Sequence, residues 1–189
     1  MGERGLAYSK ALKKVIQLLE QAKAPYMIVG GVAVAYYGYP RMTLDIDVMM
    51  ELSLDGAKRL VKLAKGAGFD LHRDEVLELT KVGNRFVAML GGRRVDFWLA
   101  KSGREREMLS HRRRVKLFDT QTWICPLEDL ILSKLEAGRN KDHDDVLGIL
   151  IRQEKKIKKD SLLKKAREFD SENKLKELME KAREVLESK

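Results

Sequence analysis

The chain has 189 residues, enough for one well-packed core and a small helical addition, and a hydrophobic content of 44% excludes an intrinsically disordered chain. Its formal net charge of +9, from 38 basic and 29 acidic residues, favours polyanionic partners such as nucleotides or RNA, although a lysine-rich solvated surface would give the same balance. No apolar run reaches the roughly 20 residues that a membrane-spanning helix needs, so we expect no membrane association.

The single cysteine, Cys125, cannot form an internal disulfide, which predicts a cytoplasmic protein. The three histidines lack the spacing of zinc ligands. Lys and Glu are abundant while Asn and Gln are scarce, which favours a thermophilic source.

The first half of the chain alternates helical and strand-like hydrophobic patterns. Pro25 ends the first helix, and Gly91-Gly92 predicts a hairpin turn. In chain order the patterns predict a helix over 8–23, a strand over 26–29, a Gly30-Gly31 turn into a helix over 32–37, a strand over 45–50, a helix over 54–65, and strands over 69–71, 85–90 and 93–99.

The second half is mainly helical by the same criteria. After a basic stretch over 101–116 the patterns predict short β segments over 115–118 and 122–124, a helix from Pro126 to Ala137, a helix from Lys141, and two further helices that break near Asp170-Ser171. We therefore predict a core over residues 1–125 and a C-terminal helical subdomain over 126–189. The alternative for the tail is an arm that binds a partner.

The Gly30-Gly31 turn between a strand and a helix predicts a phosphate-binding site. The first N–H groups of a helix point outward at the positive end of its dipole, and glycine lets a phosphate approach the backbone closely. Gly-Gly turns are also common in proteins without ligands, so the turn alone does not establish a phosphate site, and a second feature must lie beside it.

Asp45 and Asp47 provide that second feature. Residues two apart on a strand point to the same face, so both carboxylates converge while Ile46 and Val48 point into the core. Two neighbouring carboxylates repel each other unless a cation neutralises them, and carboxylate oxygens suit Mg²⁺. The alternative is a strand with one solvated acidic face.

Together these residues resemble the signature of the DNA polymerase β nucleotidyltransferase superfamily. Val29-Gly30-Gly31 is followed, after thirteen residues, by Asp45-Ile46-Asp47-Val48. The form Arg41-x-Thr43-x-Asp45 is similar to AbiEii-type and related small nucleotidyltransferases. The resemblance, which covers residues 25 to 150, implies an α/β (α+β) nucleotidyltransferase fold with a mixed, mainly antiparallel sheet flanked by helices and a C-terminal helical annex.

The resemblance also implies further site residues. A third metal-binding carboxylate is expected from a later strand, where Asp96 lies opposite the core side chains Val95 and Phe97; Glu75 and Glu78 are fallback candidates. The nucleotide-binding residues that the resemblance implies are Gly30, Gly31, Arg41, Thr43, Lys134, Arg139 and Asp142. Asp142 as a helix cap and Lys134 as a solvated side chain are the alternatives.

The implied activity is metal-dependent transfer of a nucleoside monophosphate from an NTP to an acceptor hydroxyl. Two Mg²⁺ ions, or Mn²⁺ in their place, would be held by Asp45, Asp47 and Asp96. An RNA acceptor such as tRNA is suggested by a basic cluster, for which a plain basic surface is the alternative. This cluster comprises Arg104, Arg106, Arg112, Arg113 and Arg114. Two other functions stay open: transfer to a protein partner in a toxin–antitoxin pair, and a non-catalytic nucleotide-binding or scaffold protein.

Overall fold

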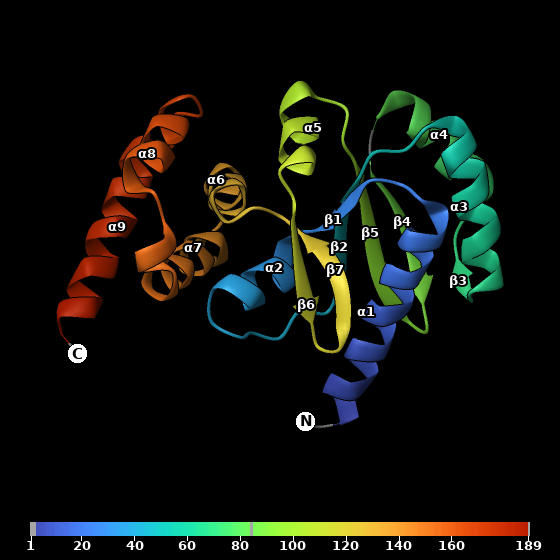
Figure 1. The fold of residues 1–189 in the computed structure, drawn as a ribbon, viewed down its shortest axis with the longest axis horizontal. Coiled ribbons are helices and arrows are strands. Elements are labelled where there is room, and N and C mark those ends of the chain that lie inside the picture. The colour runs from blue at the N-terminus through green and yellow to red at the C-terminus, as the bar shows by residue number, and fades with distance from the viewer. Residues whose placement is uncertain (1–2, 84, 189) are drawn as a thin grey trace. The chain divides into compact units, whose positions relative to one another are not determined.

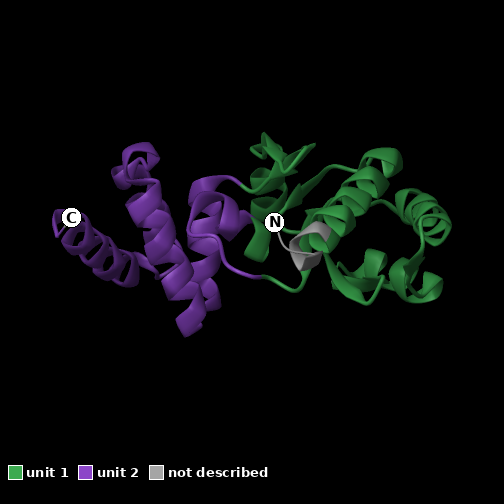
Figure 2. Cartoon of the chain, turned by 90° about the horizontal axis from the view of Figure 1, so that it is seen from below, with its two compact units in different colours: residues 1–32, 43–125 green, residues 33–42, 126–189 purple. Residues whose placement is uncertain are grey.

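The computed structural model describes residues 3–83 and 85–188. The chain forms two compact units, shown in Figure 2. Unit 1 comprises residues 1–32 and 43–125, and unit 2 comprises residues 33–42 and 126–189. No helix in the described residues is long and apolar enough to cross a membrane.

Unit 1 is built on a seven-stranded mixed sheet with the strand order β3-β4-β5-β2-β1-β7-β6 (Figure 1). Four of its strand pairs are antiparallel, whereas β2 pairs with β5, and β1 with β7, in parallel. The strands are β1 (Tyr26–Ile28), β2 (Ile46–Met50), β3 (Phe69–Asp70), β4 (Arg85–Leu90), β5 (Arg93–Leu99), β6 (Arg113–Leu117) and β7 (Thr120–Ile124). The predicted mixed, mainly antiparallel sheet is therefore confirmed.

One face of this sheet forms the hydrophobic core with helices α1 (Glu3–Ala22) and α3 (Leu54–Gly66). The apolar stripe of α1 and the inward residues of β2 and β5 meet there, and Ile46, Val48 and Val95 are fully buried. Ser53 caps α3 by accepting a hydrogen bond from the Gly56 N–H, which fixes where that helix begins. Since side chains alternate along a strand, burial of these residues directs Asp47 and Asp96 to the other face.

Two helices in unit 1 correct the sequence interpretation. Helix α4 (Arg73–Val82) lies between two predicted strands, and it ends at Gly83, which has a left-handed backbone with φ 73°. Helix α5 (Gly103–Ser110) occupies part of the stretch that we described only as basic. The fallback acids Glu75 and Glu78 therefore lie on α4 and not on the sheet.

Unit 2 is helical and includes most of α2 (Gly30–Tyr37), which begins in unit 1. Residues 33–42 pack against α7 within this unit: Gly38 lies next to Ile149, and the Gln153 side chain donates to the Tyr37 carbonyl at 2.6 Å. The remaining elements are α6 (Leu127–Ala137), α7 (Asn140–Arg152), the 3₁₀ turn η1 (Glu154–Lys156), α8 (Lys159–Arg167) and α9 (Glu172–Glu187). The predicted break between two terminal helices near Asp170 is confirmed.

Candidate active site

The glycine turn lies directly against the acidic strand. Gly30 has φ +59°, and a Cβ on it would lie 2.2 Å from the Asp47 Oδ2 atom. A Cβ on Gly31 would lie 2.5 Å from the Thr43 hydroxyl oxygen, and the Val29 N–H donates to the Asp47 carbonyl at 3.0 Å. Gly30 is therefore required for its positive φ and for the space that Asp47 occupies, and Gly31 is required for the space that Thr43 occupies.

We expect Gly30→Ala to lower the free energy of unfolding by about 2–3 kcal/mol, because it combines a positive φ with a clash against Asp47. Gly91→Ala is the matched control, since Gly91 has φ +55° and a Cβ added to it would meet no heavy atom within 4 Å. The control should lose only about 1 kcal/mol from backbone strain. Chemical denaturation of both variants measures the difference, and equal losses would mean that the contact with Asp47 has no energetic weight.

Asp47 and Asp96 are neighbours across the parallel pair β2–β5, where their Cα atoms are in register. Burial raises the pKa of Asp47; a hydrogen bond from Trp98 lowers it, the negative charges of Asp96 and Asp45 raise it, and the Gly31 N–H lowers it, with a net rise. Because burial is the largest of these causes, the ionised Asp47 carboxylate is disfavoured on its own, and a bound cation would favour it.

Asp96 is paired with two arginines that the sequence patterns did not identify. Its carboxylate accepts two hydrogen bonds from Arg94, at 2.8 and 2.9 Å, and lies 3.0 Å from the Arg85 guanidinium. The Arg85 guanidinium also stacks on the Trp98 ring at 4.9 Å. Arg94 was detectable, because a residue two positions from Asp96 on one strand shares its face. Arg85 comes from β4, and only the strand pairing brings it to Asp96.

Asp45 is exposed and stands immediately before β2, where its backbone is held by side chains from distant elements. The Tyr8 hydroxyl donates to the Asp45 carbonyl at 3.1 Å, and Arg93 donates to the Leu44 carbonyl at 2.8 Å. The Arg93 guanidinium lies over the Tyr8 ring at 4.6 Å, so the two residues form one clamp. The Thr43 hydroxyl donates to the Asp45 carbonyl at 3.3 Å. This clamp fixes the backbone from which the Asp45 carboxylate projects.

Comparison with solved structures finds the same fold in several proteins of one kind. The antibiotic-resistance factor ANT(2'')-Ia aligns with a TM-score of 0.57 at 13% identity, over 97% of this chain and 95% of that one. The lincosamide antibiotic adenylyltransferase LnuA, bound to lincomycin, aligns with a TM-score of 0.51 at 15% identity, over 79% and 96% of the two chains. TM1012 of Thermotoga maritima, described as a nucleotidyltransferase, aligns with a TM-score of 0.50 at 15% identity, over 73% and 89%. No protein-family model and no curated protein sequence matches the chain.

The chain has a nucleotidyltransferase fold. The nucleotidyltransferase fold that the sequence resemblance implied is thereby confirmed. The nucleotidyltransferase fold brings the glycine turn beside Asp47, with Asp96 on the neighbouring strand and Asp45 directly before β2.

The oxygen donors of the nucleotidyltransferase fold suit a divalent cation only in part. Asp45 and Asp47 offer the carboxylate oxygens that Mg²⁺ prefers, and burial raises the pKa of Asp47 in the absence of a cation. The Asp96 carboxylate, however, is engaged by Arg85 and Arg94. Accordingly, among residues 3–83 and 85–188, no three His, Cys, Asp or Glu side chains form a group that could hold a metal ion. The two residues Asp45 and Asp47 fit a cation, and Asp96 fits one only if its arginine partners release it.

In unit 2, the predicted residues Arg41, Lys134, Arg139 and Asp142 share one ionic network with Asp145. The Lys134 ammonium contacts Asp142 at 2.7 Å and Asp145 at 2.9 Å, and it is almost fully buried. Arg41 binds both oxygens of Asp145, at 2.7 and 2.9 Å, while Arg139 binds both oxygens of Asp142. The alternative of a solvated Lys134 is therefore wrong, because its charge is buried between two aspartates. Asp145 is a member of this network that the predicted site lacked.

Burial alone would raise the pKa of Asp142, but hydrogen bonds from Arg139 and Lys134 outweigh it and hold the pKa below its ordinary value of 3.8. The ionised carboxylate therefore stabilises the folded state above pH 3.8, and this contribution is lost as the pH falls from there through the folded-state pKa. We expect the difference in unfolding free energy between the wild-type protein and Asp142→Asn to shrink as the pH falls below 3.8. Urea titrations at several pH values measure it. A difference independent of pH would show that the charge of Asp142 has no part in the network's stability.

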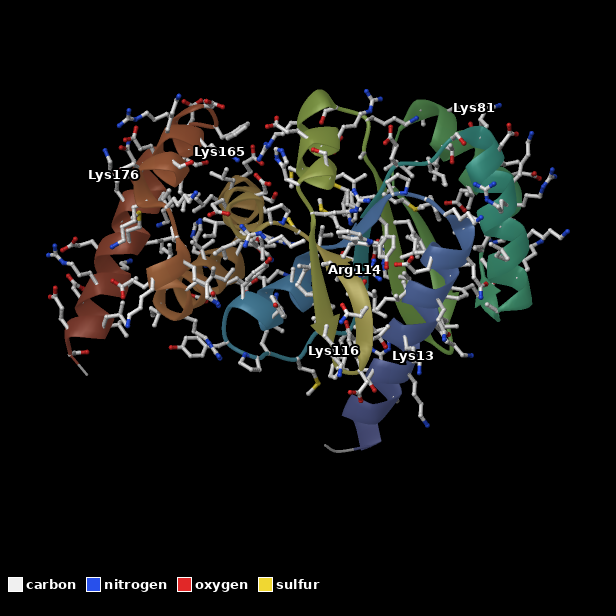
Figure 3. All side chains as sticks on the ribbon, in the orientation of Figure 1. Lys13, Lys81, Arg114, Lys116, Lys165 and Lys176 are labelled. Carbon is white, nitrogen blue, oxygen red and sulfur yellow. The ribbon has the colours of Figure 1, made fainter. Side chains whose placement is uncertain are left out.

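The predicted basic cluster is divided among several elements. Arg104 and Arg106 lie on α5, whereas Arg113 and Arg114 lie on β6 (Figure 3, where Arg114 is labelled). The guanidinium groups of Arg112 and Arg114 lie over the Trp123 ring, at 4.6 and 5.4 Å. Arg112, directly before β6, and Arg114 on β6 thus hold two positive charges over one aromatic ring of β7.

Proposed function

We propose that this protein transfers a nucleoside monophosphate from an NTP to an acceptor hydroxyl. The observation that carries the proposal is the contact between the Gly30-Gly31 turn and Asp47, next to Asp96 in register on the neighbouring strand. A turn that exposes N–H groups at the start of α2 suits the triphosphate, and the carboxylates suit the cations that accompany it.

In this proposal Gly30, Gly31 and Thr43 bind the phosphates of the NTP. Asp45 and Asp47 would hold Mg²⁺, joined by Asp96 once Arg85 and Arg94 release it; the bound metal supplies charge neutralisation and activation of the acceptor oxygen. The Tyr8–Arg93 clamp keeps Asp45 in place. Asp96 is suited to receive the proton of the acceptor hydroxyl, because it lies beside Asp47.

For unit 2 taken by itself, we propose that Lys134, Arg41 and Arg139 are nucleotide-binding side chains. The side chains of Arg41 and Arg139 are 37% and 60% exposed, so both guanidinium groups are accessible to an anionic ligand. Asp142 would position Lys134 and Arg139 and would not itself contact a phosphate.

For the acceptor we propose RNA, because Arg112 and Arg114 stack on Trp123 in the β6–β7 hairpin. Salt should weaken RNA binding steeply if these arginines contact phosphates. A small-molecule acceptor is the second candidate, since ANT(2'')-Ia and LnuA are antibiotic-modifying proteins whose structures include adenylyl-2''-tobramycin and lincomycin. A protein acceptor is a third outcome that the same experiment detects.

The experiment incubates the protein with Mg²⁺, each α-labelled NTP, and in separate reactions total RNA, total protein, tobramycin or lincomycin. Label in RNA supports the proposed acceptor, and label in another fraction replaces it while supporting nucleotidyl transfer. Asp70→Asn, an exposed acid on β3, serves as the control and should transfer at the wild-type rate. If no fraction is labelled with any NTP, the proposed transferase activity is wrong.

A further inference from the structure

A second candidate binding site lies in unit 1, away from the glycine turn and the paired acids. A pocket of about 330 Å³ opens where β2 and β5 end, and its lining includes Glu51, Ser53 and Lys101, which follow those two parallel strands. The paired acids lie toward the other end of β2. Since β2 has five residues, about 13 Å of strand separates its two ends. The pocket is therefore a separate feature and not an extension of the candidate active site.

Four cations line this pocket: Arg59 on α3, Arg106 on α5, and Lys23 and Lys101 in the connections after α1 and β5. Arg59 donates to the Ala22 carbonyl at 3.0 Å, and Lys101 donates to the Thr80 carbonyl at 2.6 Å. These backbone contacts hold the two charged groups in position without neutralising them. In the described part of the chain, neither Arg59, Lys101 nor Lys23 forms an ion pair with a carboxylate.

Acidic groups near the pocket do not offset this charge. Glu51, the carboxylate in the lining, lies 3.6 Å from Arg106, and both side chains are half exposed, so the pair is weak. The Glu105 carboxylate accepts hydrogen bonds from the backbone N–H groups of Lys101 and Ser102, which cap α5. Asp55 pairs with Lys58 on the exposed surface of α3. The pocket thus keeps a net positive charge.

The backbone adds to the same preference. Ser53 and Gly56 belong to the first turn of α3, a helix of 13 residues, so the positive end of its dipole faces the pocket lining. A concave site with positioned cations and a helix N-terminus favours a compact anion that carries several oxygen acceptors. A volume of about 330 Å³ is within the range of small-ligand sites.

We propose that this pocket binds a phosphate group of a phosphorylated ligand, independently of the nucleotide site. Arg59 and Arg106 are the principal ligand-binding side chains, Lys23 and Lys101 complete the positive lining, and the positive end of the α3 dipole adds to it. The phosphate can belong to a small phosphorylated molecule or to an RNA backbone, and both present the same group. This proposal does not depend on transferase activity.

The test uses the full-length protein in metal-free buffer with a chelator, titrated with pyrophosphate and followed by amide chemical shifts and calorimetry. We expect shifts at Ser53, Gly56 and Lys101. Removing one cation should weaken pyrophosphate binding by about tenfold, because a hydrogen bond between charged groups contributes that much. Arg59→Gln and Arg106→Gln are the test variants, and the second leaves the backbone contacts intact. Lys62→Gln, an exposed lysine on α3 outside the pocket, is the control and should bind like the wild-type protein.

Two further titrations distinguish the sources of the phosphate. Shifts of the same amides with AMP indicate a small phosphorylated ligand, and shifts with a short RNA lacking a terminal phosphate indicate a nucleic-acid backbone; either result supports the site. The proposal is overturned if pyrophosphate moves only amides around Gly30 and Gly31. Equal pyrophosphate affinity in Arg59→Gln, Arg106→Gln and Lys62→Gln would overturn it as well. These measurements detect binding only, so their outcome is the same whether or not the protein has transferase activity.

Discussion

Replacing Asp47 with Asn is expected to lower the rate of nucleotidyl transfer by at least about a hundredfold while leaving the protein folded. Asn keeps the shape of the side chain and can still accept the hydrogen bonds from Trp98 and the Gly31 N–H. It removes the negative charge that the proposed cation requires. Transfer of label from an NTP measures the rate, and thermal unfolding measures the fold.

The stability of Asp47→Asn separates a functional role from a structural one. Burial of the Asp47 carboxylate raises its pKa, so the ionised form is unfavourable in the folded protein. A neutral amide at this position should therefore unfold at a temperature no lower than the wild-type protein. Retained transfer in Asp47→Asn would refute the metal-binding role. A large drop in the unfolding temperature would show instead that the carboxylate is a structural group.

Replacing Lys134 with Met is expected to lower the free energy of unfolding by about 3 kcal/mol. Methionine preserves most of the side-chain volume but removes the ammonium group between Asp142 and Asp145, whose side chains are only 0% and 4% exposed. Arg139 and Arg41 remain, yet two buried carboxylates then share fewer cations. Urea denaturation at pH 7 without nucleotide measures the loss, so the result does not depend on catalysis.

Lys176→Met provides the matched control on the surface of unit 2. Lys176 pairs with Glu172 at 2.8 Å on α9, but its side chain is 56% exposed, and such pairs contribute less than about 1 kcal/mol. If Lys134→Met loses no more stability than this control, the ionic network is not a stabilising feature of unit 2. Lys134 would then be retained only for a ligand.

Sequence patterns within one strand or turn predicted those parts of the fold that depend on that strand or turn alone. The bounds of β4 and β5 follow from alternation around the Gly91-Gly92 turn, and the same alternation places Asp47 and Asp96 opposite the core. Helix α5 was missed, although Ser102 and Glu105 form a capping box that is visible in the sequence. This helix has few apolar residues, so its hydrophobic pattern was not recognised within the arginine-rich stretch.

The same local patterns could not predict contacts between segments that are distant in the sequence. Tyr8 reaches Asp45 across 37 positions, and Arg85 reaches Asp96 because β4 and β5 pair in one register. Asp145 stood beside the predicted Asp142, but only the folded helices show that it shares Lys134. Sequence periodicity identifies the face on which a side chain lies, whereas its partners depend on which elements pack together.

The course of the chain between the two units has a consequence for engineering the protein. The backbone leaves unit 1 within α2, returns to it at Thr43 and leaves it again after Cys125, so no single cut separates the units. A fragment ending at Cys125 would keep Tyr37, Gly38 and Arg41 but lose α7, on which they pack. The far end of the helix that begins at Gly30 would then lose its support. Truncation should therefore disturb the Gly30-Gly31 turn even though every residue of that turn is retained.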